Sequence, residues 1–79
     1  MNTMELEQHK TFSKVEAIAL MKQGKRVMHR YFSNDEWITM VGNIIKMEMG
    51  QQCWATEFWR DREGVAWETD WSLFEEKQN

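Results

Sequence analysis

The chain has 79 residues, of which 42% are hydrophobic and 29% charged, and its net charge is −3. This length is typical of one globular domain, and the negative charge argues against general binding of DNA or RNA polymers, which needs an excess of Lys and Arg. No apolar run is long enough for a membrane span, and the acidic N-terminus does not resemble a secretory signal, so we expect a cytoplasmic protein with no membrane partner.

The first marked element is a helix that begins after Ser13. Ser13 and Glu16 fit the capping box Ser-x-x-Glu, in which each residue's side chain accepts a hydrogen bond from the other's backbone. Phe12 precedes the cap, and apolar residues recur at helical spacing after it. Gly24 most easily adopts the left-handed conformation that follows a last helical turn, so we expect the helix over residues 14–23.

After the glycine the apolar period changes to two, which predicts strands. The first predicted strand runs over 25–32 and is followed by a turn at 33–35. A second strand, 37–41, and a third, 44–49, are joined by a Gly-Asn hairpin turn at 42–43. The face of the first strand opposite Val27, His29 and Tyr31 presents Arg26, Met28, Arg30 and Phe32.

The C-terminal half is predicted to contain a loop, a short helix and a last strand. We expect a loop over residues 51–54 and a helix over residues 55–62, and Gly64 ends this helix. The final alternating segment places Trp67 near Trp71.

The sequence therefore predicts an α+β domain in the order helix, three strands, short helix, strand. We expect residues 1–11 to form a flexible or edge segment and 12–79 to form the single domain. A small antiparallel sheet with the N-terminal helix packed on one face fits this order. The opposite face or the sheet edge is then left for a ligand or for another subunit.

Few side chains are available for metal or covalent chemistry. One cysteine, Cys53, cannot form an internal disulfide, and together with His9 and His29 it gives no metal-ligand spacing and no catalytic set. We expect no metal, no cofactor and no enzymatic activity. A domain this small without such cross-links often buries apolar surface between copies, so we also expect a homo-oligomer.

Aromatic rings are unusually frequent: the chain has five Trp, four Phe and one Tyr. A small domain can bury only some of them, and an exposed flat ring suits a planar ligand such as a nucleobase, or a partner surface. Phe32, Trp37 and Trp71 are our candidates for base stacking or pocket walls.

Positive charge is concentrated in one run of this acidic chain. The helix dipole explains cations near residue 22, but Arg26 and Arg30 share the predicted face with Phe32. There a guanidinium can bind a phosphate while the ring stacks on a base, the alternative being a salt-bridged surface. His29 is either a packed core residue or a ligand contact. Asp70 either accepts from a ligand hydroxyl or base edge, or turns the chain before the last strand.

Three short stretches resemble a family of small phage proteins, the second type of Thoeris anti-defence protein. They are residues 12–18, residues 24–27 leading to the aromatic Phe32, and the closing pair Asp70 and Trp71. The resemblance implies an oligomeric protein with pockets between protomers. It also implies that the protein sequesters a cyclic ADP-ribose immune signal, or a cyclic oligonucleotide, without cleaving it.

Two positions depart from the family pattern. His29 stands where the family has an Arg, and Phe32 where it has a Trp, whereas Asp70 and Trp71 match. Arg30 or Arg26 would then have to supply the phosphate contact, and Phe32 offers a smaller stacking surface.

The predicted function is that of a phage anti-defence sponge in the host cytoplasm, that is, a protein that sequesters a cyclic nucleotide immune signal, glycocyclic ADP-ribose or a cyclic oligonucleotide, without cleaving it. The alternative is a small phage protein that inhibits a host protein by direct binding, and an enzyme that acts on nucleotides is a third possibility. The predicted ligand-binding residues are Arg26, His29, Arg30, Phe32, Trp37, Asp70 and Trp71.

Overall fold

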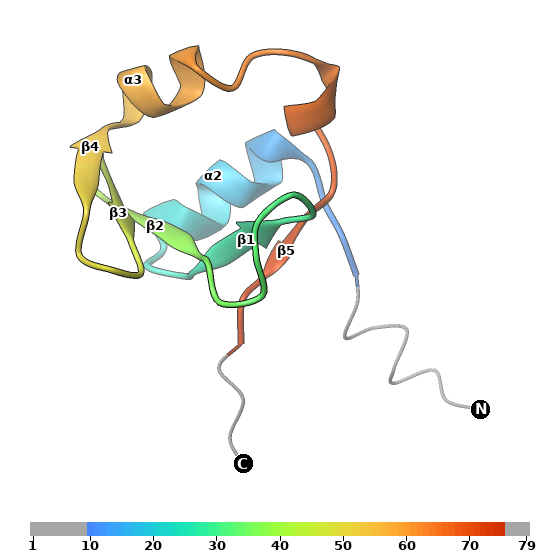
Figure 1. The fold of residues 1–79 in the computed structure, drawn as a ribbon, viewed down its shortest axis with the longest axis horizontal. Helices are drawn as coiled ribbons and strands as arrows, with labels where there is room; N and C mark the ends of the chain where they lie inside the picture. Colours follow the sequence, from blue (N-terminus) through green and yellow to red (C-terminus); the bar gives the residue numbers. More distant parts are fainter. Residues whose placement is uncertain (1–9, 76–79) are drawn as a thin grey trace.

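The computed structural model describes residues 10–75, so most of the predicted segment 1–11 lies outside the described residues. The elements in chain order are α2 (Lys14–Lys22), β1 (Val27–His29), β2 (Ile38–Val41), β3 (Ile44–Met47), β4 (Gln52–Trp54), α3 (Ala55–Arg60), the 3-10 helix η1 (Val65–Trp67) and β5 (Trp71–Leu73) (Figure 1). The predicted α+β class and the predicted order of helices and strands are confirmed, with β4 as an additional strand.

Helix α2 begins as its sequence predicts. The Ser13 hydroxyl accepts the Glu16 backbone N–H at 3.2 Å, and the Glu16 carboxylate accepts the Ser13 N–H at 3.1 Å, which completes the capping box. Gly24 has φ +89°, the left-handed conformation expected after the helix end. Ala17 and Met21 are fully buried, so this face of α2 anchors the helix on the sheet.

The five strands form one antiparallel sheet in the order β4-β3-β2-β1-β5. The loop predicted over residues 51–54 is wrong, because the chain turns at Gly50 and returns as β4, where Cys53 pairs with Ile45. This strand is three residues long and is held by backbone hydrogen bonds to β3. Three residues are too few to show a recognisable alternation in the sequence.

Strand β1 is shorter than predicted, since it ends at His29 rather than at residue 32. The Phe32 N–H donates to the His29 carbonyl at 2.9 Å, and the Arg30 N–H donates to the Asp70 carbonyl at 3.1 Å. The chain therefore turns immediately after His29. Arg30 and Phe32 lie on this turn and are not part of a strand face.

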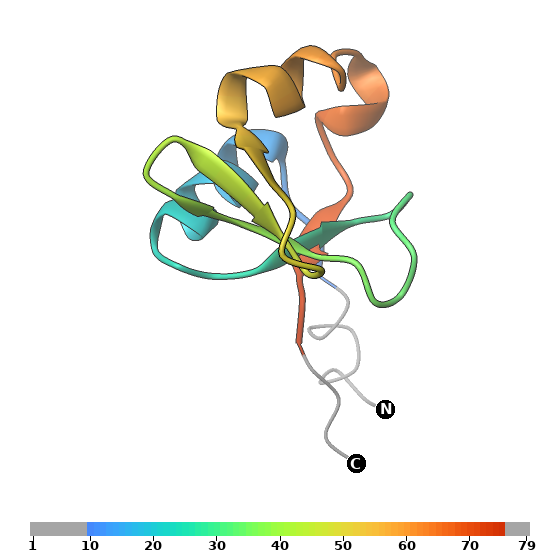
Figure 2. The same cartoon turned by 60° about the vertical axis from the view of Figure 1, so that its left-hand side comes forward.

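The two faces of the sheet differ in what covers them. Both helices contribute to one core, with α2 lying against the central strands and α3 against β3 and β4 (Figure 2). On the other face, Val41, Ile44 and Trp54 pair in a row across β2, β3 and β4, and Met28 pairs with Ser72 across β1 and β5. The core is formed by Ala17, Met21, Val27, Ile38, Met40, Ile45, Phe58 and Trp71.

Candidate functional site

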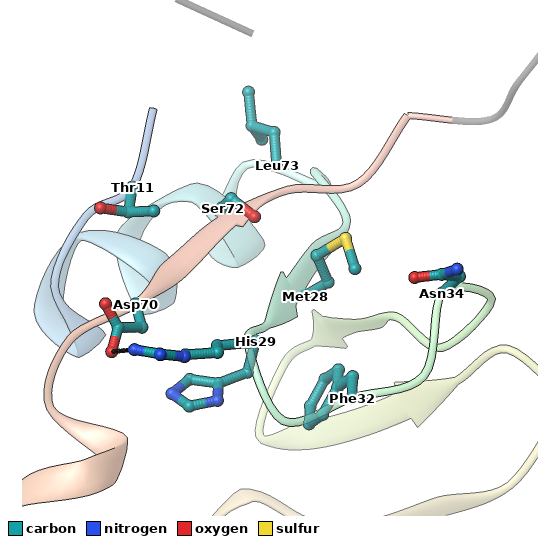
Figure 3. A pocket seen from close by; sticks show the side chains of 9 residues that line it. Thr11, Met28, His29, Phe32, Asn34, Asp70, Ser72 and Leu73 are labelled. Atoms are coloured by element: carbon teal, nitrogen blue, oxygen red, sulfur yellow. Dashed lines mark hydrogen bonds and ion pairs between the residues drawn. The ribbon is translucent and has the colours of Figure 1, made fainter. Parts of the chain in front are cut away.

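A pocket of about 460 Å³ lies where β1 ends beside β5 (Figure 3). Met28 and Ser72, paired across these two strands, contribute to its lining on the face of the sheet opposite the helices. The turn after β1 supplies further lining residues, and Thr11 adds one from the segment before α2. Four of the seven predicted site residues line this pocket, and they are His29, Arg30, Phe32 and Asp70.

Arg30 and Asp70 place opposite charges in the same pocket. The Arg30 Nη1 and the Asp70 Oδ2 are 3.5 Å apart, and the side chains are 68% and 39% exposed. Among residues 10–75, Asp70 is the only polar partner of this guanidinium. An exposed ion pair at this distance is weak, so most of the guanidinium donors remain available to an anionic ligand.

Asp70 is held in an unusual backbone conformation. It has φ +73°, and no other non-glycine residue in the described part of the chain has a positive φ. The Arg30 N–H donates to its carbonyl, and the preceding carbonyl, that of Thr69, accepts from the His29 ring at 2.9 Å. Aspartate tolerates this conformation better than most residues, and these hydrogen bonds fix it. The position of the carboxylate in the pocket is therefore set by the backbone.

His29 is a packed core residue, which is one of the two roles that the sequence left open. It is 1% exposed, and its Nδ1 accepts the Tyr31 N–H at 3.1 Å. Its Nε2 must then carry the proton, which it donates to the carbonyls of Ala66 at 3.0 Å and Thr69 at 2.9 Å. Both ring nitrogens are used within the chain, so the phosphate contact predicted for His29 does not fit this arrangement.

Trp71 belongs to the core as well. Its register partner is His29, so its side chain lies on the helix-covered face, where it is fully buried. The indole N–H donates to the Trp67 carbonyl at 2.8 Å, and the Phe32 ring meets it edge-on at 5.8 Å. The stacking role predicted for Trp71 does not fit this burial, because no ring face is open to a ligand. Phe32 is half-buried between this core and the pocket.

Arg26 and Trp37 form a separate cluster outside the pocket lining. The Arg26 guanidinium lies 4.5 Å from the Trp37 ring centre, and Trp37 contacts the Phe74 ring at 6.2 Å. Because β1 spans only three residues, Arg26 lies before its start and Arg30 after its end. The predicted site is thus divided between the pocket, this cluster and the core, where Trp71 lies, and the pocket contains only one of its two arginines.

Sequence reasoning missed several polar and apolar wall residues of the pocket. Ser72 faces outward because its neighbour Trp71 faces the core, and this alternation becomes visible once the strand is known. Asn34 lies in the predicted turn, where its type was explained by turn formation alone. The lining residues without a predicted role are Thr11, Met28, Asn34, Ser72 and Leu73.

The remaining reactive side chain, Cys53, lies outside the pocket. It is half-buried on β4, and burial, followed by the nearby charge of Glu57, raises the pKa of its thiol. Within residues 10–75, no three His, Cys, Asp or Glu side chains are grouped so that they could hold a metal ion. The same range contains no helix that is long and apolar enough to cross a membrane.

Fold and pocket together define a small α+β domain with a mixed-charge pocket beside the β1–β5 edge of its sheet. No protein-family model matches this chain, and no curated protein or solved structure matches it either.

Proposed function

We propose that the chain binds a small cyclic nucleotide in the Arg30–Asp70 pocket and sequesters it without cleaving it. The observation that carries the proposal is the meeting of a guanidinium, an aromatic ring and a carboxylate in one open pocket. Arg30 suits a phosphate, the Phe32 ring suits a base, and Asp70 suits a hydroxyl or amino donor. A nucleotide carries all three of these groups.

The size and polarity of the pocket support this ligand class. Small-molecule sites have volumes of roughly 300 to 1,000 Å³, and this pocket has about 460 Å³. Asn34 and Ser72 add neutral hydrogen-bonding groups beside the charged pair.

We propose further that the protein acts in the host cytoplasm as a homo-oligomer. The resemblance to the Thoeris anti-defence family supports an immune signal as the ligand, with glycocyclic ADP-ribose as the first candidate.

Calorimetric titration with glycocyclic ADP-ribose and a panel of cyclic nucleotides tests the proposal. We expect saturable binding and, after heat denaturation, chromatographic recovery of the ligand unchanged. Arg30→Ala should weaken binding by about 10-fold to 100-fold, the effect of losing one hydrogen-bonded charge. Arg60→Ala, which removes an exposed arginine from α3, is the matched control and should bind normally. Product formation, or no binding of any nucleotide, would contradict the proposal.

A protein inhibitor is the second candidate, and one observation favours it. Val41 and Trp54 are 60% and 56% exposed, and Ile44 joins them into one apolar row on the face of the sheet opposite the helices. Exposed apolar rows of this kind are common at protein interfaces. If this is the functional surface, Trp54→Ala should abolish capture of a defined host protein from lysate, whereas Arg30→Ala should leave the capture unchanged.

A further inference from the structure

The charges in the pocket restrict which part of a ligand it can hold. Among its lining side chains, Arg30 is the only one with a formal positive charge in this arrangement, and Asp70 is the only carboxylate. The His29 ring uses Nδ1 as an acceptor, so it carries a single proton and no charge in this hydrogen-bonding state. The lining is therefore neutral overall. A pocket of this kind has no second cation with which to bind a second phosphate.

The Asp70 carboxylate cannot easily move away from a phosphate that binds Arg30. Its carbonyl accepts the Arg30 N–H at 3.1 Å, the Thr69 carbonyl is bound by His29, and Trp71 after it is fully buried. The backbone is thus fixed on both sides of the residue. Rotation about the side chain can change the 3.5 Å approach to Arg30, but the carboxylate stays at the pocket.

We infer that each pocket holds one phosphate on Arg30 beside one hydroxyl or amino donor on Asp70. The occupant is then a single nucleotide unit, and any further phosphate of the ligand must lie outside the pocket. This inference rests on the proposed function and specifies the ligand class for the same site. Asp70 is its selectivity residue, because its carboxylate attracts a donor and disfavours a second anionic group at the position of that donor.

The size of the repulsion follows from the geometry. Two like charges about 4 Å apart in a water-exposed site change a binding constant by about 5-fold, and salt screens much of that effect. A donor on the ligand turns the same carboxylate into a favourable partner. The repulsion acts on the Arg30-bound phosphate of every probe, but a singly phosphorylated probe also gains the donor contact. Removing the charge of Asp70 should therefore raise the affinity for doubly phosphorylated probes relative to that for singly phosphorylated ones.

Asp70→Asn tests this directly, since asparagine keeps the shape of the side chain and tolerates a positive φ at least as well. The probes are 3′,5′-cyclic AMP, with one phosphate, and glycocyclic ADP-ribose and cyclic di-AMP, each with two. We expect the ratio of the affinity for the two-phosphate probes to the affinity for cyclic AMP to rise by about 5-fold in the variant at low salt. Asp61→Asn, an exposed carboxylate at the end of α3, is the control and should change neither affinity.

A second variant tests whether the change in affinity comes from the asparagine amide and not from the loss of the carboxylate. Asp70→Gly removes the whole side chain and relieves the positive φ, and it should shift selectivity in the same direction. If both variants change the affinities for all probes equally, or leave them unchanged, the inference is wrong while the proposed function stands. If neither the wild type nor the variants bind any nucleotide, the proposed function and the inference both fail.

Discussion

The two ends of the sheet are built differently. At the β1–β5 end, polar groups rest on a buried aromatic cluster, in which the His29 ring lies 4.3 Å from Trp67 and 4.7 Å from Trp71. At the β4 end, the edge strand carries Trp54 on the exposed face of the sheet. The first end can hold side chains in fixed positions, as a ligand site requires. The second offers apolar surface with little to fix it.

We expect the largest loss of stability from a substitution at Trp71, in the β1–β5 end. Trp71→Ala removes a fully buried indole and its hydrogen bond, so we expect a loss of about 3 to 5 kcal/mol in the free energy of unfolding. Urea denaturation followed by circular dichroism measures this loss. A cost below about 1 kcal/mol would mean that the aromatic cluster does not support the pocket end.

A smaller loss is expected at His29. His29→Leu keeps a buried side chain of similar size but leaves the Tyr31 N–H and two carbonyls without their ring partner. Unpartnered buried groups cost about 1 to 3 kcal/mol each where water cannot reach them, and we expect about 2 to 3 kcal/mol in total. His29→Gln, which can still donate a hydrogen bond, should recover part of the loss in the same denaturation experiment.

At the β4 end of the sheet, a substitution should reduce the free energy of unfolding only slightly. Trp54→Ala removes a side chain that is more than half exposed, and we expect less than about 1 kcal/mol of destabilisation. The same urea titration serves as the measurement. A loss as large as that of Trp71→Ala would show that the β4 end is buried in solution, as it would be against a second copy or a partner.

The smallest effect concerns Cys53, also at the β4 end. Burial raises the pKa of this thiol, so less thiolate is present at a given pH than in an ordinary cysteine. Iodoacetamide should therefore alkylate it more slowly than it alkylates a short cysteine peptide at pH 8. Since the shift favours the protonated form in the folded state, its contribution to stability is present below the ordinary thiol pKa and is lost as pH rises toward the raised value. Equal alkylation rates would contradict the burial.

Local sequence signals predicted those elements whose causes are local. The capping box at Ser13 and Glu16 and the glycine after α2 defined the helix, because each acts on residues within one turn. The end of β1 depends instead on Asp70, whose carbonyl binds the Arg30 N–H from 40 residues away in the sequence. No periodicity in the sequence contains that information.

Long-range pairing also explains why the structure divides the predicted site residues. Alternation along an assumed strand placed Arg26, Arg30 and Phe32 on one face, but the early end of β1 separated Arg26 from the other two. Asp70 and Trp71 were identified together as neighbours, yet the strand that begins at Trp71 turns the indole into the core and leaves the carboxylate at the pocket. The residue types were informative, whereas their division between core and pocket depended on long-range pairing.

The most direct test of the account is to map nucleotide binding by NMR. Cyclic AMP or glycocyclic ADP-ribose is added to the 15N-labelled protein while backbone amide and arginine side-chain shifts are followed. The account predicts changes concentrated at residues 28–34 and 70–73, including the Arg30 side chain, with Val41 and Trp54 unmoved. Changes centred on Val41 and Trp54, or no change anywhere in the spectrum, would contradict it.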